Sequence, residues 1–320
     1  MNTLKLRSIG LDLTSRCNGN CLFCPFHGIE GTISKGAEIP LEHFLRLVED
    51  LATLSPKPVV KLAGSGEPTI YRGFDQLINK LRHLDMPTRL ITNGTTLKDK
   101  AKSLKHLIGL VVSIHGDENI HDTLTKKRGA FTKAVAGIKF FRELSDTEVI
   151  INMVITPQNY NNLIQYASFG DSLGAKMRFQ HMKFVSGNAR LGSINIVQLW
   201  SQLGMIRQRF PDTIFEPEMN LDELKSYYEI STLYILNPFE CFRVHSDLPI
   251  RFDGVVIACD GSVLGDIKEQ SILDIAFGKS RHTFVKGVIQ SANSDKGLPD
   301  YCSRCCYNSK QHITRYQTCK

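Results

Sequence analysis

Short apolar segments rich in β-branched residues alternate with longer amphipathic segments from the start of the chain to about residue 182. The short segments predict six strands, at residues 8–13, 59–63, 88–92, 110–114, 148–155 and 176–181. The longer segments predict five helices between them, at residues 41–54, 74–84, 97–107, 130–144 and 161–173. The first of these helices has one apolar face, made by Leu41, Phe44, Leu45, Val48 and Leu51. Strands that alternate with helices in this way pair in parallel, through right-handed crossovers.

A sixth helix is predicted at residues 195–210, so the chain contains six β/α units. This number suits an α/β fold in which a partial (β/α)6 barrel resembles a TIM barrel but stays open on one side. In such barrels the residues that perform chemistry lie at the carboxyl ends of the strands. A doubly wound open sheet would produce a similar pattern and remains the alternative.

The alternation ends at about residue 212, and a proline-containing segment at 215–219 follows. Residues 249–260 predict two strands that turn at Asp253-Gly254, a dipeptide typical of hairpins. Two short helices precede a cysteine-rich tail, at residues 272–277 and 282–290. We therefore expect a barrel domain and a small α+β, cysteine-rich domain, in residues 1–212 and 213–320.

The composition is that of a soluble globular protein, with 42% hydrophobic and 22% charged residues. The N-terminus lacks the features of a signal peptide, and no apolar run approaches the ~18 residues of a membrane span. The net charge of +7 is modest. The chain has no run of six like charges, which a nucleic-acid-binding arm would need. We therefore expect a cytoplasmic protein that binds neither membranes nor nucleic acid.

The nine cysteines are unevenly distributed: three lie in residues 17–24, six lie in residues 241–319, and none lies between. Their number is odd and cytosolic thiols stay reduced, so we do not expect a disulfide framework. Metal ligation, catalysis and buried packing remain as roles. The clustering favours the first two, because cysteines that fill a core would be scattered.

The first cysteine cluster contains Cys17, Cys21 and Cys24, with the spacing C-x3-C-x2-C, directly after the first predicted strand. Thiolates are ligands suited to iron–sulfur clusters. Three cysteines leave one iron of a [4Fe–4S] cluster open, and an open iron can bind a substrate or cofactor. A structural zinc site that lacks one ligand is the alternative.

This spacing at the end of a first barrel strand, with Phe23 before the third cysteine, resembles the radical S-adenosylmethionine (SAM) superfamily. The resemblance implies that the open iron chelates the amino and carboxylate groups of SAM. It also implies that the reduced cluster splits SAM into methionine and a 5′-deoxyadenosyl radical. The expected cofactors are therefore a [4Fe–4S] cluster and SAM, and the expected reductant is a flavodoxin or a ferredoxin.

Further residues at strand ends resemble SAM-binding motifs of the family. Ala63-Gly64-Ser65-Gly66-Glu67-Pro68 resembles GGEP, with Ser65 in place of the first paired glycine. Thr92-Asn93-Gly94 resembles its T-N-G motif, and Arg128-Gly129 resembles an R-G step in which Lys127 could substitute for the arginine. The resemblance thus implies a SAM site built from Gly66, Glu67, Asn93, Ser113 and Arg128.

Each of these residues also has a purely structural interpretation, since serine and asparagine are common in turns at strand ends. Their order along successive strands favours the shared site. On the sixth strand, Gln180 and His181 are candidates for the barrel mouth. For His181, a hydrogen-bonded core histidine is an equally good interpretation.

The second cysteine cluster begins with C-x12-G-x4-C, formed by Cys241, Gly254 and Cys259, and continues with Cys302 and Cys305. This arrangement resembles the SPASM/twitch extension of radical SAM enzymes. The resemblance implies one auxiliary [4Fe–4S] cluster on those four cysteines. A rubredoxin-like zinc site on the same residues is the alternative.

Two cysteines, Cys306 and Cys319, remain after this assignment. Cys306 is a candidate catalytic residue, because some radical SAM epimerases use a cysteine to give a hydrogen atom to the product radical. Cys319 is either inert or an extra ligand, and its place near the terminus favours the first role.

The resemblance implies that the enzyme removes a hydrogen atom from a bound substrate. We expect it to oxidise a polar small molecule, such as a sugar or an aminocyclitol, with help from the auxiliary cluster. The core begins by residue 8, and we therefore expect no leader-binding domain before it. Maturation of a ribosomally made peptide, by epimerisation, a thioether or a carbon–carbon cross-link, is one alternative. A non-catalytic iron–sulfur electron carrier or redox sensor is another.

Overall fold

The structure is a computed structural model that describes residues 4–28, 36–182, 192–230 and 242–292. Its strands form one ten-stranded sheet in the order β10-β9-β8-β1-β2-β3-β4-β5-β6-β7. Strands β1 to β7 are all parallel to their neighbours. They are β1 (Ser8–Leu11), β2 (Val59–Leu62), β3 (Thr88–Thr92), β4 (Gly109–Ser113), β5 (Val149–Ile155), β6 (Lys176–His181) and β7 (Ile214–Glu216).

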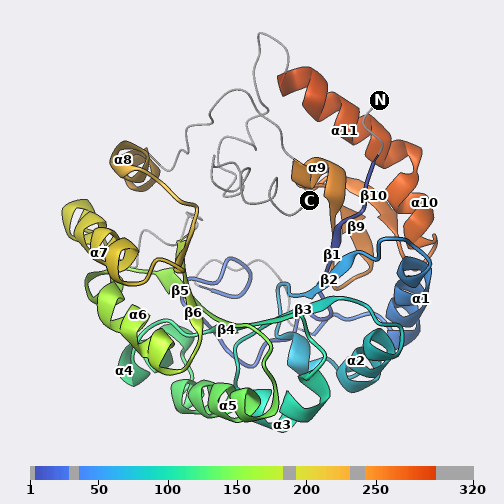
Figure 1. Cartoon of the computed structure of the whole chain (residues 1–320). Helices are drawn as coiled ribbons and strands as arrows, with labels where there is room; N and C mark the ends of the chain where they lie inside the picture. Colours follow the sequence, from blue (N-terminus) through green and yellow to red (C-terminus); the bar gives the residue numbers. More distant parts are fainter. Residues whose placement is uncertain (1–3, 29–35, 183–191, 231–241, 293–320) are drawn as a thin grey trace.

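The helices that follow these strands in the chain lie along the outer side of the curved sheet, as Figure 1 shows. They are α1 (Leu41–Ala52), α2 (Phe74–His83), α3 (Leu97–Lys100), α4 (Glu118–Thr125), α5 (Ala130–Leu144), α6 (Leu163–Ser172), α7 (Ile196–Arg209) and α8 (Leu221–Ile230). Parallel strands inside an arc of helices make a partial TIM-like barrel, which confirms the predicted α/β class. A doubly wound sheet would carry helices on both of its faces.

Alternation along the strands separates the core from the barrel interior, because successive side chains of a strand point to opposite faces. In β5, Ile151 and Met153 are buried in the hydrophobic core between sheet and helices. The same alternation turns Asn152, between these two residues, toward the interior. In β6, Phe179 belongs to that core and Arg178 to the interior. The inner polar residues are therefore placed by the strand geometry.

Two elements that the alternation did not predict complete the barrel. Strand β7 pairs with β6 within the proline-containing region and brings Glu216 to the interior. Helix α4 lies between β4 and α5, and the Asp117 side chain caps it by accepting from the Ile120 amide at 3.0 Å. The predicted helix at residues 97–107 is shorter than expected, since α3 passes into a 3-10 turn at Ala101–Leu104.

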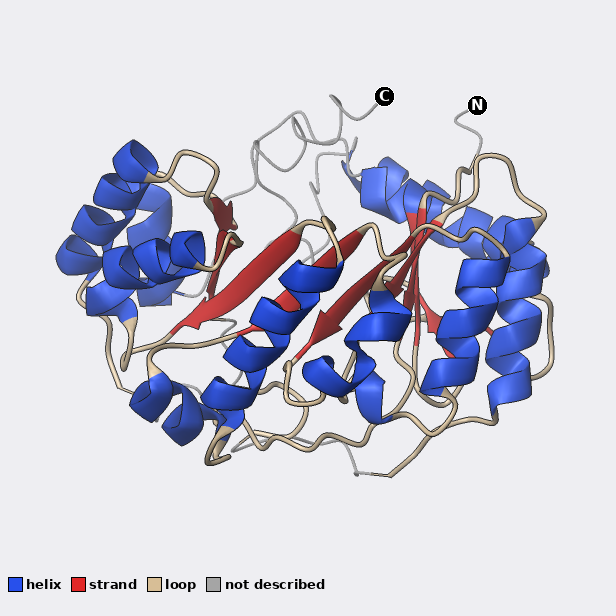
Figure 2. Ribbon diagram, turned by 60° about the horizontal axis from the view of Figure 1, so that its bottom comes forward, coloured by secondary structure: helices blue, strands red, loops and turns tan. Residues whose placement is uncertain are grey.

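The C-terminal part extends the same sheet beyond β1. Strand β8 (Asp247–Ile250) is parallel to β1. Strand β9 (Val255–Ile257) pairs antiparallel with β8, and β10 (Val263–Asp266) pairs antiparallel with β9. The predicted turn is confirmed, with Gly254 at φ +89°. Figure 2 shows the strands as one continuous layer with helices in front of it. The division into domains at residue 212 stays a prediction.

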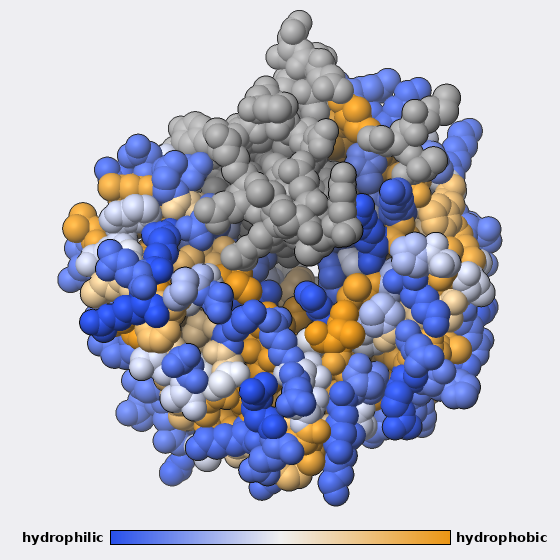
Figure 3. Space-filling model, in the orientation of Figure 1, coloured by the Kyte–Doolittle hydropathy of each residue, from blue (hydrophilic) through white to orange (hydrophobic). Residues whose placement is uncertain are grey.

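Three helices accompany these strands: α9 (Phe242–Ser246), α10 (Ile272–Phe277) and α11 (Lys279–Ala292). Helix α10 lies beside α1, where the Ser271 hydroxyl donates to the Asp50 carboxylate at 2.9 Å. None of the described helices combines the length and the apolarity needed to cross a membrane. Figure 3 shows a mostly hydrophilic outer surface, with hydrophobic residues gathered around a central hollow.

Candidate functional site

A cavity of about 520 Å³ opens inside the barrel, at the side where the parallel strands end. Each strand from β2 to β7 contributes a lining residue at or near its carboxyl end. Examples, in strand order, are Ala63, Asn93, Ser113, Val154, Gln180 and Glu216. The loop after β1 supplies another wall, and this wall carries the first cysteine cluster. The carboxyl ends of the strands therefore surround a cavity, and the binding of SAM there stays a prediction.

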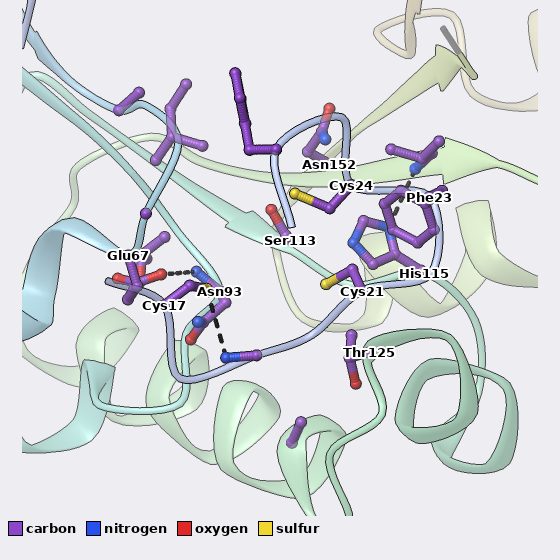
Figure 4. A pocket seen from close by; sticks show the side chains of 18 of the residues that line it. Cys17, Cys21, Phe23, Cys24, Glu67, Asn93, Ser113, His115, Thr125 and Asn152 are labelled. Carbon is purple, nitrogen blue, oxygen red and sulfur yellow. Dashed lines mark hydrogen bonds between the residues drawn. The ribbon is translucent and has the colours of Figure 1, made fainter. Parts of the chain in front are cut away.

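Cys17, Cys21 and Cys24 are half-buried and all line this cavity. Figure 4 shows the sulfurs of Cys21 and Cys24 turned toward the same open space. Gly19 lies beside two of the cysteines: a Cβ added there would be 3.8 Å, an ordinary contact distance, from the sulfurs of both Cys17 and Cys21. The backbone amides of Gly19 and His27 donate to the sulfurs of Cys17 and Cys24, each at 3.4 Å. Three thiols with amide donors are a suitable ligand set for an iron–sulfur cluster.

The cysteine loop is tied to the end of β3 by amide and hydroxyl side chains. Asn93 donates to the Asn18 side-chain oxygen at 2.7 Å, and Asn18 donates to the Thr95 hydroxyl at 3.0 Å. The Thr95 hydroxyl donates back to Asn93 at 2.8 Å, so the three side chains form a closed ring. Asn93 is thus a lining residue that also positions the loop.

The same loop is tied to the end of α4 by its backbone. The amides of Asn20 and Leu22 donate to the carbonyl oxygens of Thr125 and Leu124, at 3.0 and 2.8 Å. These bonds flank Cys21. Helix α4 is therefore part of the support for the cysteines, a role that the sequence pattern alone did not indicate.

Gly66 and Glu67 hold the end of β2 against the loop. The Glu67 amide donates to the Arg16 carbonyl at 2.8 Å, and a Cβ on Gly66 would lie 2.1 Å from the Thr14 oxygen. The Glu67 carboxylate is 3% exposed and accepts from the Thr92 hydroxyl at 2.6 Å and the Asn93 amide at 2.7 Å. Burial raises the pKa of this carboxyl, while these donors oppose the shift.

Ser65, the departure from the family's GGEP pattern, has a local reason in this chain. Its hydroxyl and its amide donate to the Asp12 carboxylate at 2.6 and 2.9 Å. A Cβ on the preceding Gly64 would lie 2.0 Å from the Asp12 side chain. Burial raises the pKa of Asp12, and the Ser65 donors counteract the shift. Asp12 and Ser65 therefore join the ends of β1 and β2.

The remaining predicted residues lie in three kinds of place: in the cavity wall, on the exposed surface and in the buried core. Ser113 and Gln180 line the cavity. Arg128 is exposed and is absent from the described lining, whereas the neighbouring Lys127 belongs to it. Burial, followed by the charge of Lys133, lowers the pKa of Lys127. His181 is 2% exposed and bonded to the Tyr228 hydroxyl at 2.9 Å, which confirms the interpretation as a core histidine.

The wall formed by β5, β6 and β7 was not predicted as part of the site, apart from Gln180. Arg178 donates to the Asn152 side-chain oxygen at 2.6 Å, and its guanidinium lies 3.5 Å from the Glu216 carboxylate. All three line the cavity. The signal available in the sequence was a polar residue at alternate positions of otherwise apolar strands.

Of the second cysteine cluster, the structure describes only Cys259, which is exposed and lies just after β9. Cys241, Cys302, Cys305, Cys306 and Cys319 lie outside the described residues. The auxiliary ligand set and the role of Cys306 therefore stay predictions.

Two family models match the chain. The model of the radical SAM superfamily matches residues 11–170, and that of SPASM, an iron–sulfur cluster-binding domain, matches residues 241–306. Among curated proteins, a probable GTP 3′,8-cyclase of Methanocella arvoryzae is 31% identical over 169 residues, which are 51% of this chain and 53% of that protein. One from Saccharolobus solfataricus is 30% identical over 53% of this chain and 54% of that protein. The chain thus spans about half the length of the curated relatives it matches.

Solved structures share the fold. Streptococcus suis SuiB bound to S-adenosylmethionine has a TM-score of 0.68 at 20% identity, covering 95% of this chain and 72% of that one. The structure of anSMEcpe with bound AdoMet has a TM-score of 0.67 at 17% identity, covering 98% and 91%. At these identities the similarity concerns the fold alone.

Proposed function

Since this chain belongs to the radical SAM superfamily, we propose that it cleaves SAM reductively at a [4Fe–4S] cluster bound by Cys17, Cys21 and Cys24. The two matching domains imply that cluster, SAM and an auxiliary cluster. The observation that carries the proposal is the convergence of the three cysteines on one cavity with Glu67 and Asn93. When bound, cluster and SAM supply a 5′-deoxyadenosyl radical that removes a hydrogen atom from the substrate.

The chain's own residues would hold SAM beside the cysteines. The Ser113 hydroxyl offers an oxygen acceptor for an ammonium group, and the Lys127 ammonium suits a carboxylate. Asn93 would act by positioning the cysteine loop, since its side-chain oxygen already accepts from the amide and the hydroxyl of Thr95. We propose Lys127 for this role in place of Arg128, because Arg128 is exposed. Gly66 keeps the backbone of the loop close to the strand end, where no other side chain would fit.

The substrate would lie against the wall of Asn152, Arg178, Gln180 and Glu216. This wall offers hydrogen-bond donors and acceptors together, which suits the hydroxyl and amino groups of a sugar or an aminocyclitol. Peptide maturation remains the second candidate. GTP is a third, suggested by the curated relatives, but the Arg178 charge is already paired with Glu216, so the pair is a poor match for a triphosphate.

The auxiliary cluster would take an electron from the substrate radical, giving a net oxidation. We place its ligands at Cys241, Cys259, Cys302 and Cys305, and we keep Cys306 as the candidate hydrogen donor of the alternative epimerisation. The proposed setting is the cytoplasm, with a flavodoxin or a ferredoxin as the electron source.

The central test is cluster loading followed by SAM cleavage. Anaerobically reconstituted protein should hold about eight irons, and with dithionite it should release 5′-deoxyadenosine. Replacing Cys17, Cys21 and Cys24 by alanine should abolish the cleavage, and replacing Cys241 and Cys259 should halve the iron content. Normal cleavage by the triple variant would refute the proposal, and an electron carrier would show no cleavage in any form.

The substrate class is tested by incubation in D2O with aminocyclitols, candidate precursor peptides and GTP, followed by mass spectrometry. A dehydrogenase should give a product two mass units lighter that carries a new ketone. A peptide epimerase would instead take up one solvent deuterium. Turnover of GTP alone would replace the small-molecule assignment with that of the curated relatives.

A further inference from the structure

His115 lies two residues beyond β4 and lines the cavity, although it is only 4% exposed. Its ring packs edge-on against Phe23, the residue before Cys24, with ring centroids 4.6 Å apart. The ring also stacks on that of His121, with ring centroids 5.7 Å apart. These contacts hold the imidazole plane beside the cysteine loop, in a position that the proposed SAM-binding residues do not use.

The hydrogen bonds of His115 determine its tautomer. The backbone amide of Val154 donates to its Nδ1 at 3.2 Å, and an amide N–H cannot accept in return. Nδ1 is therefore without a proton, and the neutral ring carries its proton on Nε2. Burial, followed by the charge of His121, lowers the pKa of His115 well below its ordinary value, so the neutral ring is the form present at pH 7.

The direction of the Nε2 proton follows from Figure 4. The second ring nitrogen of His115 lies across the ring from the dashed bond and faces the open space between Cys21 and Cys24. The sulfurs of these two cysteines face the same space. A fixed N–H donor thus points toward the place where sulfur ligands gather.

We propose that His115 is a positioning residue that donates a hydrogen bond from Nε2 to sulfur of the first cluster, and thereby raises its reduction potential. A donor at sulfur offsets negative charge, so it stabilises the reduced, more negative cluster over the oxidised one. The inference rests on the proposed binding of that cluster by Cys17, Cys21 and Cys24. It adds a residue that sets how readily the cluster is reduced.

The experiment is an anaerobic redox titration of the reconstituted protein without SAM, followed by electron paramagnetic resonance. The signal that is missing from the Cys17, Cys21 and Cys24 triple variant identifies the first cluster. His115→Phe keeps an aromatic ring but removes the donor, and His115→Gln keeps an N–H donor. His181→Gln is the control, because His181 is buried on the other face of β6.

We expect His115→Phe to hold the wild-type amount of iron and to shift the midpoint potential of the first cluster to more negative values. His115→Gln should lie between the two, and His181→Gln should match the wild type. An unchanged potential in His115→Phe, or loss of the cluster from both His115 variants, would overturn the inference. Failure of the proposed function is distinguishable, since then the wild type itself would lack the first cluster or would not cleave SAM.

Discussion

His181 is a buried residue whose protonation state can be tested directly. Burial, followed by the charge of Arg207, lowers its pKa from 6.5 to about 3. In the unfolded chain, His181 therefore binds a proton as the pH falls below 6.5. In the folded chain it binds that proton only near pH 3. The stabilisation is complete above pH 6.5 and is lost as the pH falls, at about 1.4 kcal/mol per pH unit for this residue.

The variant His181→Gln isolates this effect, because glutamine can still bond to the Tyr228 hydroxyl but does not titrate. Between pH 6.5 and 4, the unfolding free energy of the variant should fall less steeply with pH than that of the wild type. The two slopes should differ by about 1.4 kcal/mol per pH unit, the value for one proton. Urea denaturation at a series of pH values measures both slopes. Parallel slopes would show that His181 is protonated in the folded state, contrary to this account.

At the scale of residues, the sequence predicts what local motifs reveal and misses what the fold brings together. Gly66, Glu67, Asn93 and Ser113 follow recognisable strand ends, and all four line the cavity. Glu216 was missed because a three-residue strand has too few positions to show any periodicity. Asn152 and Arg178 were missed because a polar residue at an alternate position of a strand does not show which polar residues of different strands share a site.

At the scale of elements, the docking of the cysteine loop against β2 depends on the absence of a side chain at residue 66. A Cβ there would lie 2.1 Å from the Thr14 oxygen and 2.3 Å from the Arg16 oxygen, so Gly66→Ala must displace the loop backbone. We expect the variant to lose the first cluster, about four of eight irons, and with it SAM cleavage. Iron analysis after reconstitution measures the loss.

A matched glycine serves as the control for this variant. Gly204 lies within α7, and a Cβ added there would meet nothing within 4 Å. Gly204→Ala should therefore keep all the iron and stabilise the fold by about 0.5–1 kcal/mol, since alanine favours the helix. Full iron in Gly66→Ala would mean that the loop tolerates the displacement and that its docking is not what holds the cluster.

The prediction of elements succeeded where the periodicity was long and regular. Helix α5 begins and ends as predicted, at Ala130 and Leu144, and the six predicted strands are all present. Helix α4 was missed because only two of its eight residues, Ile120 and Leu124, are apolar, which is too few for a clear pattern. The partner of β8 could not be predicted either, since pairing between strands far apart in sequence leaves no local signal.

At the scale of the whole molecule, β8 joins the first strand, β1, to the C-terminal strands β9 and β10 in one sheet. It pairs along the full length of β1, the strand that leads into the cysteine loop, and Ile9 and Leu11 of β1 are fully buried. Polar side chains join three strands here. The Ser8 hydroxyl donates to the Asp247 carboxylate at 2.6 Å, and the Lys61 ammonium lies 3.3 Å from the same carboxylate.

This pairing of β8 with β1 predicts that the barrel and the C-terminal strands unfold together. Asp247→Ala would leave Ser8 and Lys61 without their shared acceptor, and we expect it to destabilise the fold by about 1–2 kcal/mol. Asp222→Ala is the control, because its pair with Lys225 is exposed and 4.0 Å long and should contribute nothing measurable. In urea, circular dichroism and iron release should report one transition, shifted only in Asp247→Ala. Two separate transitions in that variant, with iron retained through the first, would mean that β1 keeps its place without β8.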